Sequence, residues 1–257
     1  MKKQKTNELN IILVDLETSP NLSWTWGKWE QNVIDFERET HILCFAYKKL
    51  GERQTHAYAL RDFKRYKKDK EDDYFLVKKM HEVFCDADII IAQNGDNFDI
   101  KMANTAFIRN GLTPPTPIKT IDTLKIAKSK FKFNSNKLDD LGKILGLGRK
   151  VDTGGFNLWK GCMNGEKKSW DKMIRYNKQD VVLLEKIYNK LKPWATNHPN
   201  INRTFKADTC QVCGSKHVEQ RGWSYLNSGL SRKKKFVCKE PDCGHWNLGK
   251  TEKVPKQ

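Results

Sequence analysis

Residues 11–17 of this chain read Ile-Ile-Leu-Val-Asp-Leu-Glu. The apolar run predicts a buried strand over residues 11–16 that ends at Glu17. Asp15 and Glu17 are two positions apart, so their side chains project from the same face of the predicted sheet. Strand interiors disfavour acidic residues, and two carboxylates on one face repel each other unless a cation lies between them. The pair therefore indicates either a cation site or a polar strand end.

Two further stretches carry acidic residues. Residues 94–99 read Asn-Gly-Asp-Asn-Phe-Asp, directly after a predicted strand and at the start of a predicted helix. Residues 176–180 read Tyr-Asn-Lys-Gln-Asp within a long predicted helix, where Tyr176 and Asp180 share one face. Taken alone, Asp99 fits a helix-start acid and Asp180 fits a surface acid. Acidic residues gathered from several elements require cations, and hard oxygen ligands favour magnesium or manganese over zinc.

The apolar patterns predict an α/β domain. Residues 42–48 and 55–60 have the character of strands joined by a turn at Gly51, so with residues 11–16 they predict an antiparallel meander. Helices alternating with strands follow, which is typical of α/β proteins. The further predicted elements are helices near residues 76–84, 100–107, 138–145 and 170–190, the last with Ser169 as its N-cap, and strands at residues 88–92 and 118–121.

The composition indicates a polyanionic partner. Forty-eight Lys and Arg against 31 Asp and Glu give the chain a net charge of +17, and such a surplus is typical of proteins that bind nucleic acid. Hydrophobic residues make up 38% of the sequence, which excludes wholesale disorder. No apolar run approaches the ~18 residues of a membrane span, and residues 11–14 are too short for a signal peptide. We therefore expect a soluble, cytoplasmic protein with no membrane partner.

Four of the seven cysteines lie in the last fifth of the chain. They form two close pairs, as a tetrahedral zinc site needs. Disulfides are the alternative, and no other sign of export supports them. The longer spacing of the second pair leaves open whether His217 or His245 replaces one thiolate, although four thiolates are favoured. The cysteines occur as Cys210-x2-Cys213 and Cys238-x4-Cys243.

Aromatic and basic residues lie between the two cysteine pairs. Such a mixture stacks bases and pairs with phosphates. Alternatively, the aromatics pack a module that has little other core, and the basic residues are solvated. The sequence leaves these two interpretations balanced. The candidate nucleic-acid contacts of this tail are Trp223, Tyr225, Arg232, Lys233, Lys234 and Lys235.

The acidic motifs resemble those of the DEDD superfamily of 3′–5′ exonucleases, which have the RNase H-like fold. Arg175 stands where histidine-type members carry His, and Tyr176 fits the tyrosine-type (DEDDy) branch. The resemblance covers roughly residues 9–192 and is greatest to the exonuclease domain of family-B DNA polymerases and its free-standing relatives. The motifs occur in the family's order as Asp15-x-Glu17, Asn94-x3-Phe98-Asp99 and Tyr176-x3-Asp180.

The resemblance implies two magnesium or manganese ions about 4 Å apart. Asp15 would bridge both ions, Glu17 and Asp180 would complete the site of the attacking water, and Asp99 would hold the second ion. Tyr176 would orient that water, because a reference pKa near 10 makes its hydroxyl a poor base at neutral pH.

Three other residues lie beside these motifs in the sequence. By family analogy, Thr18 and Asn94 contact the terminal nucleotide. Asp122 opens an Ile-Asp-Thr-Leu segment that adds to the likeness. It is interpreted as a helix N-cap in preference to an indirect role in the site.

These observations predict an α/β protein with an RNase H-like mixed sheet, an antiparallel meander plus parallel strands, flanked by helices. The predicted domains are an exonuclease domain over residues 1–197, a linker over 198–206 and a zinc ribbon with one structural zinc over 207–257. The predicted activity is removal of 5′-mononucleotides from 3′ ends, mainly of single-stranded DNA.

Other functions and partners stay open at this point. The same motifs suit a 3′–5′ RNA exonuclease, because discrimination of the 2′-hydroxyl depends on pocket shape. A structure-specific endonuclease on the same fold is a further alternative. A catalytically silent nucleic-acid-binding protein is disfavoured by the complete set of site residues. A separate DNA polymerase or a replication or repair factor is a candidate protein partner.

Overall fold

The computed structural model describes residues 9–29, 32–201 and 209–255. The chain divides into two compact units. The first comprises residues 10–124 and 135–186, and the second comprises residues 1–9, 125–134 and 187–257. The domain boundaries expected near residues 197 and 206 stay a prediction, and residues 202–206 of the expected linker lie outside the described residues.

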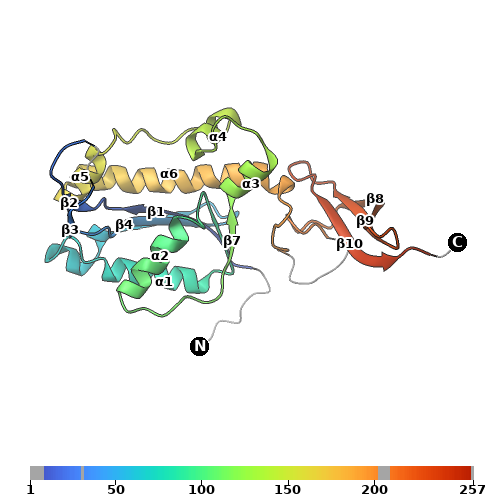
Figure 1. Ribbon diagram of the computed structural model, residues 1–257, viewed down its shortest axis with the longest axis horizontal. Coiled ribbons are helices and arrows are strands. Elements are labelled where there is room, and N and C mark those ends of the chain that lie inside the picture. The colour runs from blue at the N-terminus through green and yellow to red at the C-terminus, as the bar shows by residue number, and fades with distance from the viewer. Residues whose placement is uncertain (1–8, 30–31, 202–208, 256–257) are drawn as a thin grey trace. The chain divides into compact units, whose positions relative to one another are not determined.

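A five-stranded mixed sheet forms the centre of the first unit, in the order β5-β4-β1-β6-β7 (Figure 1). The central strand β1 pairs antiparallel with β4 and parallel with β6; β4 pairs antiparallel with β5, and β6 pairs parallel with β7. The predicted meander and the predicted α/β fold class are therefore confirmed. The strands are β1 (Ile11–Thr18), β4 (Ile42–Lys49), β5 (Thr55–Ala59), β6 (Ile89–Ala92) and β7 (Lys119–Asp122).

Helices cover both faces of this sheet (Figure 1). Helices α1 (Tyr74–Asp86) and α2 (Asp99–Arg109) pack together on one face, with α1 against β4 and α2 against β1. Helix α6 (Lys167–Leu191) runs along the other face, where Trp170, Met173 and Tyr176 join the core. The shorter helices are α3 (Thr123–Lys130), α4 (Leu138–Ile144) and α5 (Asn157–Asn164), with 3-10 turns at Leu60–Asp62, Lys64–Lys67 and Lys192–Trp194.

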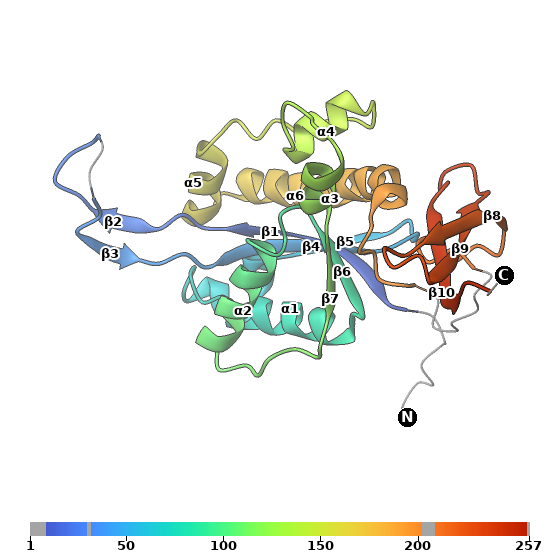
Figure 2. The same cartoon turned by 45° about the vertical axis from the view of Figure 1, so that its right-hand side comes forward.

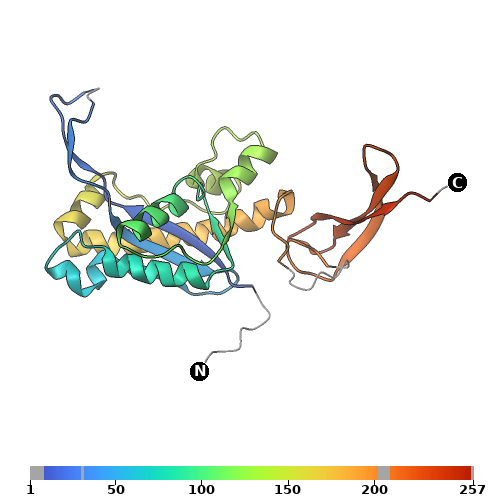
Figure 3. The ribbon, with the colours of Figure 1, turned by 60° about the horizontal axis from the view of Figure 1, so that its bottom comes forward.

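A two-stranded hairpin interrupts the chain between β1 and β4. Strands β2 (Leu22–Trp24) and β3 (Asp35–Arg38) pair antiparallel and extend beyond the ends of β1 and β4 (Figures 2 and 3). All four residues of β3 are exposed. The sequence patterns did not reveal this hairpin, because its apolar side chains do not face a core.

The second unit contains a three-stranded antiparallel sheet in the order β10-β9-β8. One small cluster of buried residues in this part of the chain consists of Cys210, Val212, Cys238 and Cys243. The expected ribbon bounds include residues 207–208 and 256–257, which lie outside the described residues. The strands are β8 (Val218–Tyr225), β9 (Ser231–Cys238) and β10 (Trp246–Lys253).

The start of α6 differs from its prediction. The helix begins at Lys167, so Ser169 lies inside the first turn and is not the N-cap. The Ser169 hydroxyl instead donates a hydrogen bond to Glu166 at 2.9 Å. The apolar periodicity that marked the helix begins only at Trp170, whereas the polar first turn carries no periodic signal. In the part of the chain that the structure describes, no helix is long and apolar enough to cross a membrane.

Candidate active site

Asp15 and Glu17 lie where the parallel part of the sheet ends. Strand β6 pairs with β1 only along Ile11–Leu13, whereas β4 continues to pair alongside Asp15 and Glu17. The β6 edge of β1 is thus free of a strand beside the two acidic residues. A polar site at this edge follows from β1 being longer than its parallel neighbour.

Asp99 occupies part of this free edge. Its Oδ1 accepts a hydrogen bond of 3.1 Å from the backbone N–H of Leu16, in place of a strand partner. Asp99 is the first residue of α2, where the sequence predicted the start of a helix, and its side chain is buried. The loop between β6 and α2, which positions Asp99, passes close to the end of β6. A Cβ on Gly95 would lie only 2.4 Å from the Cβ of Ala92.

Helix α6 supplies Tyr176 and Asp180, which share one face one turn apart. Ligand oxygens of Asp15, Glu17 and Asp180 all lie within 4.8 Å of one another. The three carboxylates therefore converge from β1 and α6. Asp99 is outside this trio, although its negative charge raises the pKa of both Asp15 and Glu17.

Two neighbours of the carboxylates were missed by the sequence analysis. The side-chain amide of Asn177 is fully buried and donates to Oδ2 of Asp15 at 2.6 Å, so it sets the orientation of that carboxylate. The Trp159 side chain on α5 hydrogen-bonds Glu17, and its ring lies 6.4 Å from that of Tyr176. Asn177 sits between Tyr176 and Asp180 in the sequence, and that position alone did not mark it as part of the site.

Lys150 is the third missed residue, and it brings a positive charge to the cluster. It lies in the segment between α4 and α5, and its Nζ is 2.6 Å from Oδ2 of Asp180. The same ammonium lies 4.9 Å from the ring centroid of Tyr176 and hydrogen-bonds the tyrosine hydroxyl. Lys150 is one of many basic residues in this chain, so nothing in its local sequence distinguished it.

Burial disfavours ionisation of the four acidic groups, and repulsion from neighbouring carboxylates adds to it. Burial is the first cause in each case, and it raises the pKa of Glu17 to about 8 and of Asp99 to about 7. The pKa of Asp15 is raised well above its ordinary value by burial and then by Glu17, Asp99 and Asp180. Burial also raises the pKa of Asp180, against the opposing charge of Lys150. A cation among these groups would favour their ionised forms.

The donor set fits a hard divalent cation. It consists of carboxylate oxygens from three residues within 4.8 Å of one another, with Asp99 adjacent, and contains neither sulfur nor imidazole. Magnesium and manganese prefer such oxygen ligands. One ammonium, that of Lys150, does not balance the negative charge of Asp15, Glu17 and Asp180 when all three are ionised.

The remaining predicted residues of this region lie close by. Thr18 is the last residue of β1 and is half-buried. Asn94 has a φ of 62°, and its backbone N–H donates to Oδ1 of Asp122 at 2.9 Å. The same Oδ1 accepts from the N–H of Leu124 at 2.9 Å, in the first turn of α3. Asp122 thus caps a helix, as expected, and also holds the loop that leads to Asp99.

The four tail cysteines converge, with all their sulfur atoms within 4.8 Å of one another. The Sγ atoms of Cys210 and Cys243 are 3.8 Å apart, and those of Cys213 and Cys238 are 3.6 Å apart. A disulfide has an S–S distance of about 2.05 Å, whereas Zn–S bonds of about 2.3 Å in a tetrahedron place sulfurs roughly 3.8 Å apart. The arrangement fits a zinc ion bound by four thiolates. His245 instead bonds the carbonyl of Pro193 through Nδ1.

The basic run of the tail is divided between two faces of the ribbon sheet. Side chains alternate along β9, so Arg232 and Lys234 share the face of Trp223, and Lys233 and Lys235 point to the other face. The guanidinium of Arg232 lies 3.7 Å from the ring centroid of Trp223, which covers one face of that indole. Tyr225 is exposed. The six predicted contacts therefore do not form one continuous patch.

The fold and the carboxylate cluster agree with a comparison against known families. A family model described as the RNase H superfamily matches residues 32–192, which is more than half of the chain. The protein belongs to the RNase H superfamily. The matched region includes Asp99, Tyr176 and Asp180, whereas Asp15 and Glu17 precede it. Membership and the acidic cluster together support a nuclease in general, with nucleic acid as its substrate.

Among curated proteins, none matches the sequence. Among solved structures, the chain is similar to the family B DNA polymerase from the hyperthermophilic archaeon Pyrobaculum calidifontis, with 14% identity and a TM-score of 0.49. The similarity covers 75% of this chain and 26% of the polymerase chain, so this chain matches about a quarter of that protein.

Proposed function

We propose that the protein is a DEDDy-type 3′–5′ exonuclease that depends on two magnesium or manganese ions and releases 5′-mononucleotides, mainly from single-stranded DNA. The observation that carries the proposal is the convergence of Asp15, Glu17 and Asp180 within 4.8 Å, beside Tyr176 and Lys150. Asp99, adjacent to the trio, would complete the ligand set. When bound, such ions lower the pKa of a water molecule and stabilise the charge that develops on the scissile phosphate.

Protein side chains would position the water and the phosphate. Burial raises the pKa of Tyr176 above its ordinary value. Its hydroxyl therefore stays protonated and acts as a hydrogen-bond donor, not as a base. Lys150 bonds that hydroxyl and Asp180, and it would bring an ammonium next to the phosphate oxygens. Asn177 would keep the Asp15 carboxylate oriented toward the ligands.

The product ladder tests this function. Purified protein with magnesium or manganese should shorten a 5′-labelled DNA oligonucleotide one nucleotide at a time. Asp15→Asn should lower the rate by at least about 10³-fold while the circular dichroism spectrum is unchanged, because one carboxylate of the converging trio is lost. A matched control, Asp86→Asn, changes an exposed acidic residue at the end of α1.

Parallel arms of the same assay separate the alternatives. RNA oligonucleotides measure the preference for sugar type. Circular single-stranded DNA has no end, so cleavage of the circle would identify an endonuclease. An unchanged rate in Asp15→Asn would contradict the assigned site, and an absence of products from every substrate would contradict the nuclease itself.

We further propose that residues 207–257 form a zinc ribbon that contacts the substrate through Arg232, Lys234 and Tyr225. The exposed ring of Tyr225 and the two basic side chains on one face of the sheet support this. Each lost phosphate contact lowers the salt slope of binding to single strands by about 0.7. The variant Arg232→Gln/Lys234→Gln should therefore bind DNA with a salt slope shallower by about 1.4, whereas Lys233→Gln/Lys235→Gln is the control from the other face. Equal slopes in both variants would contradict the assignment.

A further inference from the structure

The hairpin that follows the first acidic motif exposes an unusual amount of aromatic surface. Trp24, Trp26 and Trp29 are 62%, 89% and 75% exposed. Leu22, Val33, Ile34 and Phe36 of the same segment are also exposed. Indole is the largest apolar side chain, and clustered exposed apolar residues mark interaction sites on folded proteins. We name this surface, made of the described residues between 21 and 39, the tryptophan arm.

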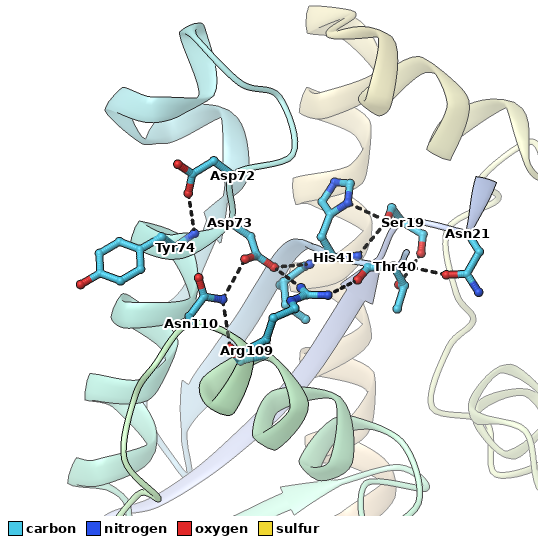
Figure 4. A network of polar contacts seen from close by, with 11 residues as sticks. Ser19, Asn21, Thr40, His41, Asp72, Asp73, Tyr74, Arg109 and Asn110 are labelled. Carbon is cyan, nitrogen blue, oxygen red and sulfur yellow. Dashed lines mark hydrogen bonds and ion pairs between the residues drawn. The ribbon is translucent and has the colours of Figure 1, made fainter. Parts of the chain in front are cut away.

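The base of the arm is held firmly by polar contacts (Figure 4). Ser19 and His41 exchange backbone and side-chain hydrogen bonds, with the His41 N–H donating to the Ser19 hydroxyl at 2.9 Å and the Ser19 N–H donating to the His41 carbonyl at 2.9 Å. Asn21 accepts from the N–H of Thr40 at 2.7 Å. The guanidinium of Arg109 binds the Thr40 carbonyl at 2.6 Å.

A buried carboxylate anchors this network to the helices. Asp73 accepts hydrogen bonds from Arg109 at 2.9 Å, from the side chain of Asn110 at 3.0 Å and from the backbone N–H of Ile42 at 3.0 Å. Burial lowers the pKa of His41, which favours its neutral ring as the acceptor of a hydrogen bond from the Ser19 hydroxyl. The arm therefore extends β1 and β4, and these hydrogen bonds at its base fix the direction in which it leaves the sheet.

The charge of the arm differs in sign from that of the whole chain. Residues 21–39 carry two basic residues, Lys28 and Arg38, and four acidic residues, which gives −2 in a chain of +17. Phosphates are therefore not attracted to this segment. Indole rings bind the faces of nucleobases without sequence preference and without a phosphate contact. An aromatic and slightly acidic arm suits the bases of a strand whose backbone is held elsewhere.

The arm is also within reach of a strand that occupies the carboxylate site. Trp26 follows Glu17 by nine positions, so its Cα lies at most about 30 Å from that of Glu17, at 3.3–3.6 Å per residue. Nucleic acid rises about 3.4 Å per nucleotide along one strand. Trp26 therefore lies at most about nine nucleotides from the scissile bond, and Trp29, which follows Glu17 by twelve positions, at most about twelve.

We propose that the tryptophan arm stacks on unpaired bases of the strand that is being cleaved, within about twelve nucleotides of its 3′ end. The proposal rests on the proposed function, because it takes the carboxylate site as the position of that end. Its occupant is the nucleobase face of single-stranded nucleic acid. The geometry assigns to the arm a role in substrate binding that is independent of phosphate contacts.

A binding cycle with abasic substrates tests the proposal. The full chain carrying Asp15→Asn, which prevents cleavage, is titrated against a fluorescein-labelled DNA strand about 15 nucleotides long. The single changes Trp24→Ala, Trp26→Ala and Trp29→Ala are compared with this parent. Loss of one stacked base weakens binding by about 5- to 100-fold. We expect a loss in this range for at least one variant, and restoration by Phe at the same position.

Abasic sites placed singly along the last roughly twelve nucleotides then identify the base that is stacked. Removing that base should weaken binding to the parent and leave binding to the Trp→Ala variant unchanged. The salt slope should be equal for parent and variant, because no phosphate contact is lost. Ile108→Ala on α2, which truncates another exposed apolar side chain, is the control and should bind like the parent.

Three results would overturn the proposal. Equal affinity of the parent and the triple Trp→Ala variant would show that the arm does not bind the strand. If a Trp→Ala variant binds more weakly than the parent at every abasic position, the indoles do not act on bases. A lower sedimentation coefficient of the triple variant, with unchanged DNA affinity, would show that the arm binds a second copy of this chain. The product ladder of the wild-type protein is measured separately, so failure of the proposed function is distinguishable from failure of this inference.

Discussion

Lys150 illustrates how a single residue alters the chemistry of the acidic cluster. Its ammonium contacts both Asp180 and Tyr176, so its removal changes the charge beside the carboxylates and the position of the tyrosine hydroxyl. Lys150→Met should lower the rate of nucleotide release by about 10²-fold, the usual loss when one preorganised donor is removed. The control Lys168→Met removes an exposed ammonium from the first turn of α6 and should leave the rate unchanged. A rate in Lys150→Met within twofold of wild type would contradict a role for this ammonium.

The raised pKa values predict a pH dependence of the metal-free protein. The folded state holds the proton of Glu17 up to a pKa of about 8, whereas the unfolded chain releases it near the ordinary value of 4.5. The folded state therefore binds more protons than the unfolded chain, and its stability falls as pH rises through this window. In chelator, the melting temperature of wild type should fall by several degrees relative to Glu17→Gln between pH 5 and pH 8.

Bound metal should remove the difference in melting temperature between wild type and Glu17→Gln that develops as pH rises. Saturating manganese favours the ionised carboxylates, so the melting temperature of wild type at pH 8 should rise well above its value in chelator. Glu17→Gln should gain less, because one ligand is missing. A wild-type protein whose melting temperature does not fall relative to Glu17→Gln as pH rises would contradict the raised pKa of Glu17.

At the scale of elements, the connection between β6 and α2 decides where Asp99 lies. Gly95 is required there because a Cβ would overlap the Cβ of Ala92 at 2.4 Å. Gly95→Ala should lower the free energy of unfolding by about 1–3 kcal/mol, the usual cost of overpacking, and reduce nuclease activity by displacing Asp99. Urea unfolding and the product ladder measure the two effects.

The neighbouring alanine provides a matched control. In the double variant Ala92→Gly/Gly95→Ala, the atom that causes the overlap is removed. Stability and activity should recover in part, although glycine in β6 has its own cost in strand stability. Equal stability of the single and double variants would show that the overlap with Ala92 is not what makes this glycine necessary.

At the scale of the whole molecule, the chain combines a large apolar core around the mixed sheet with a ribbon sheet whose small core is mainly cysteine. A core that small does not stabilise a fold by itself, so the ribbon should depend on its metal.

Purified protein should contain one zinc, measured by mass spectrometry. Cys213→Ser should lose it and expose β8–β10 to rapid hydrogen exchange, while amides of β1 and β4 stay protected. Control values come from Cys85→Ser, a partly buried cysteine outside the cluster. Full protection of β8–β10 in zinc-free protein would contradict the assignment.

Much of the candidate site was predictable because its signals are local. The apolar run over residues 11–16 and the helical spacing around Tyr176 and Asp180 depend on neighbours a few positions away. Such patterns also identified the mixed sheet, because each strand carries its own apolar signature. The spacing of the four tail cysteines was predictive for the same reason. The start of α6 was misplaced, because a polar first turn has no such signature.

The sequence by itself determined the fold class, the strand that carries Asp15 and Glu17, and the chemical type of each candidate metal ligand, because these follow from residue identity and short-range periodicity. Only the tertiary structure brought Lys150 and Asn177 to the carboxylates, and it alone exposed the indoles of the tryptophan arm and divided the basic run of β9 between two faces. These features depend on contacts between segments that are far apart in the chain, or on what fails to cover a side chain. The free energy of such contacts comes from packing and desolvation between residues that are far apart in the sequence, so local sequence patterns do not predict them.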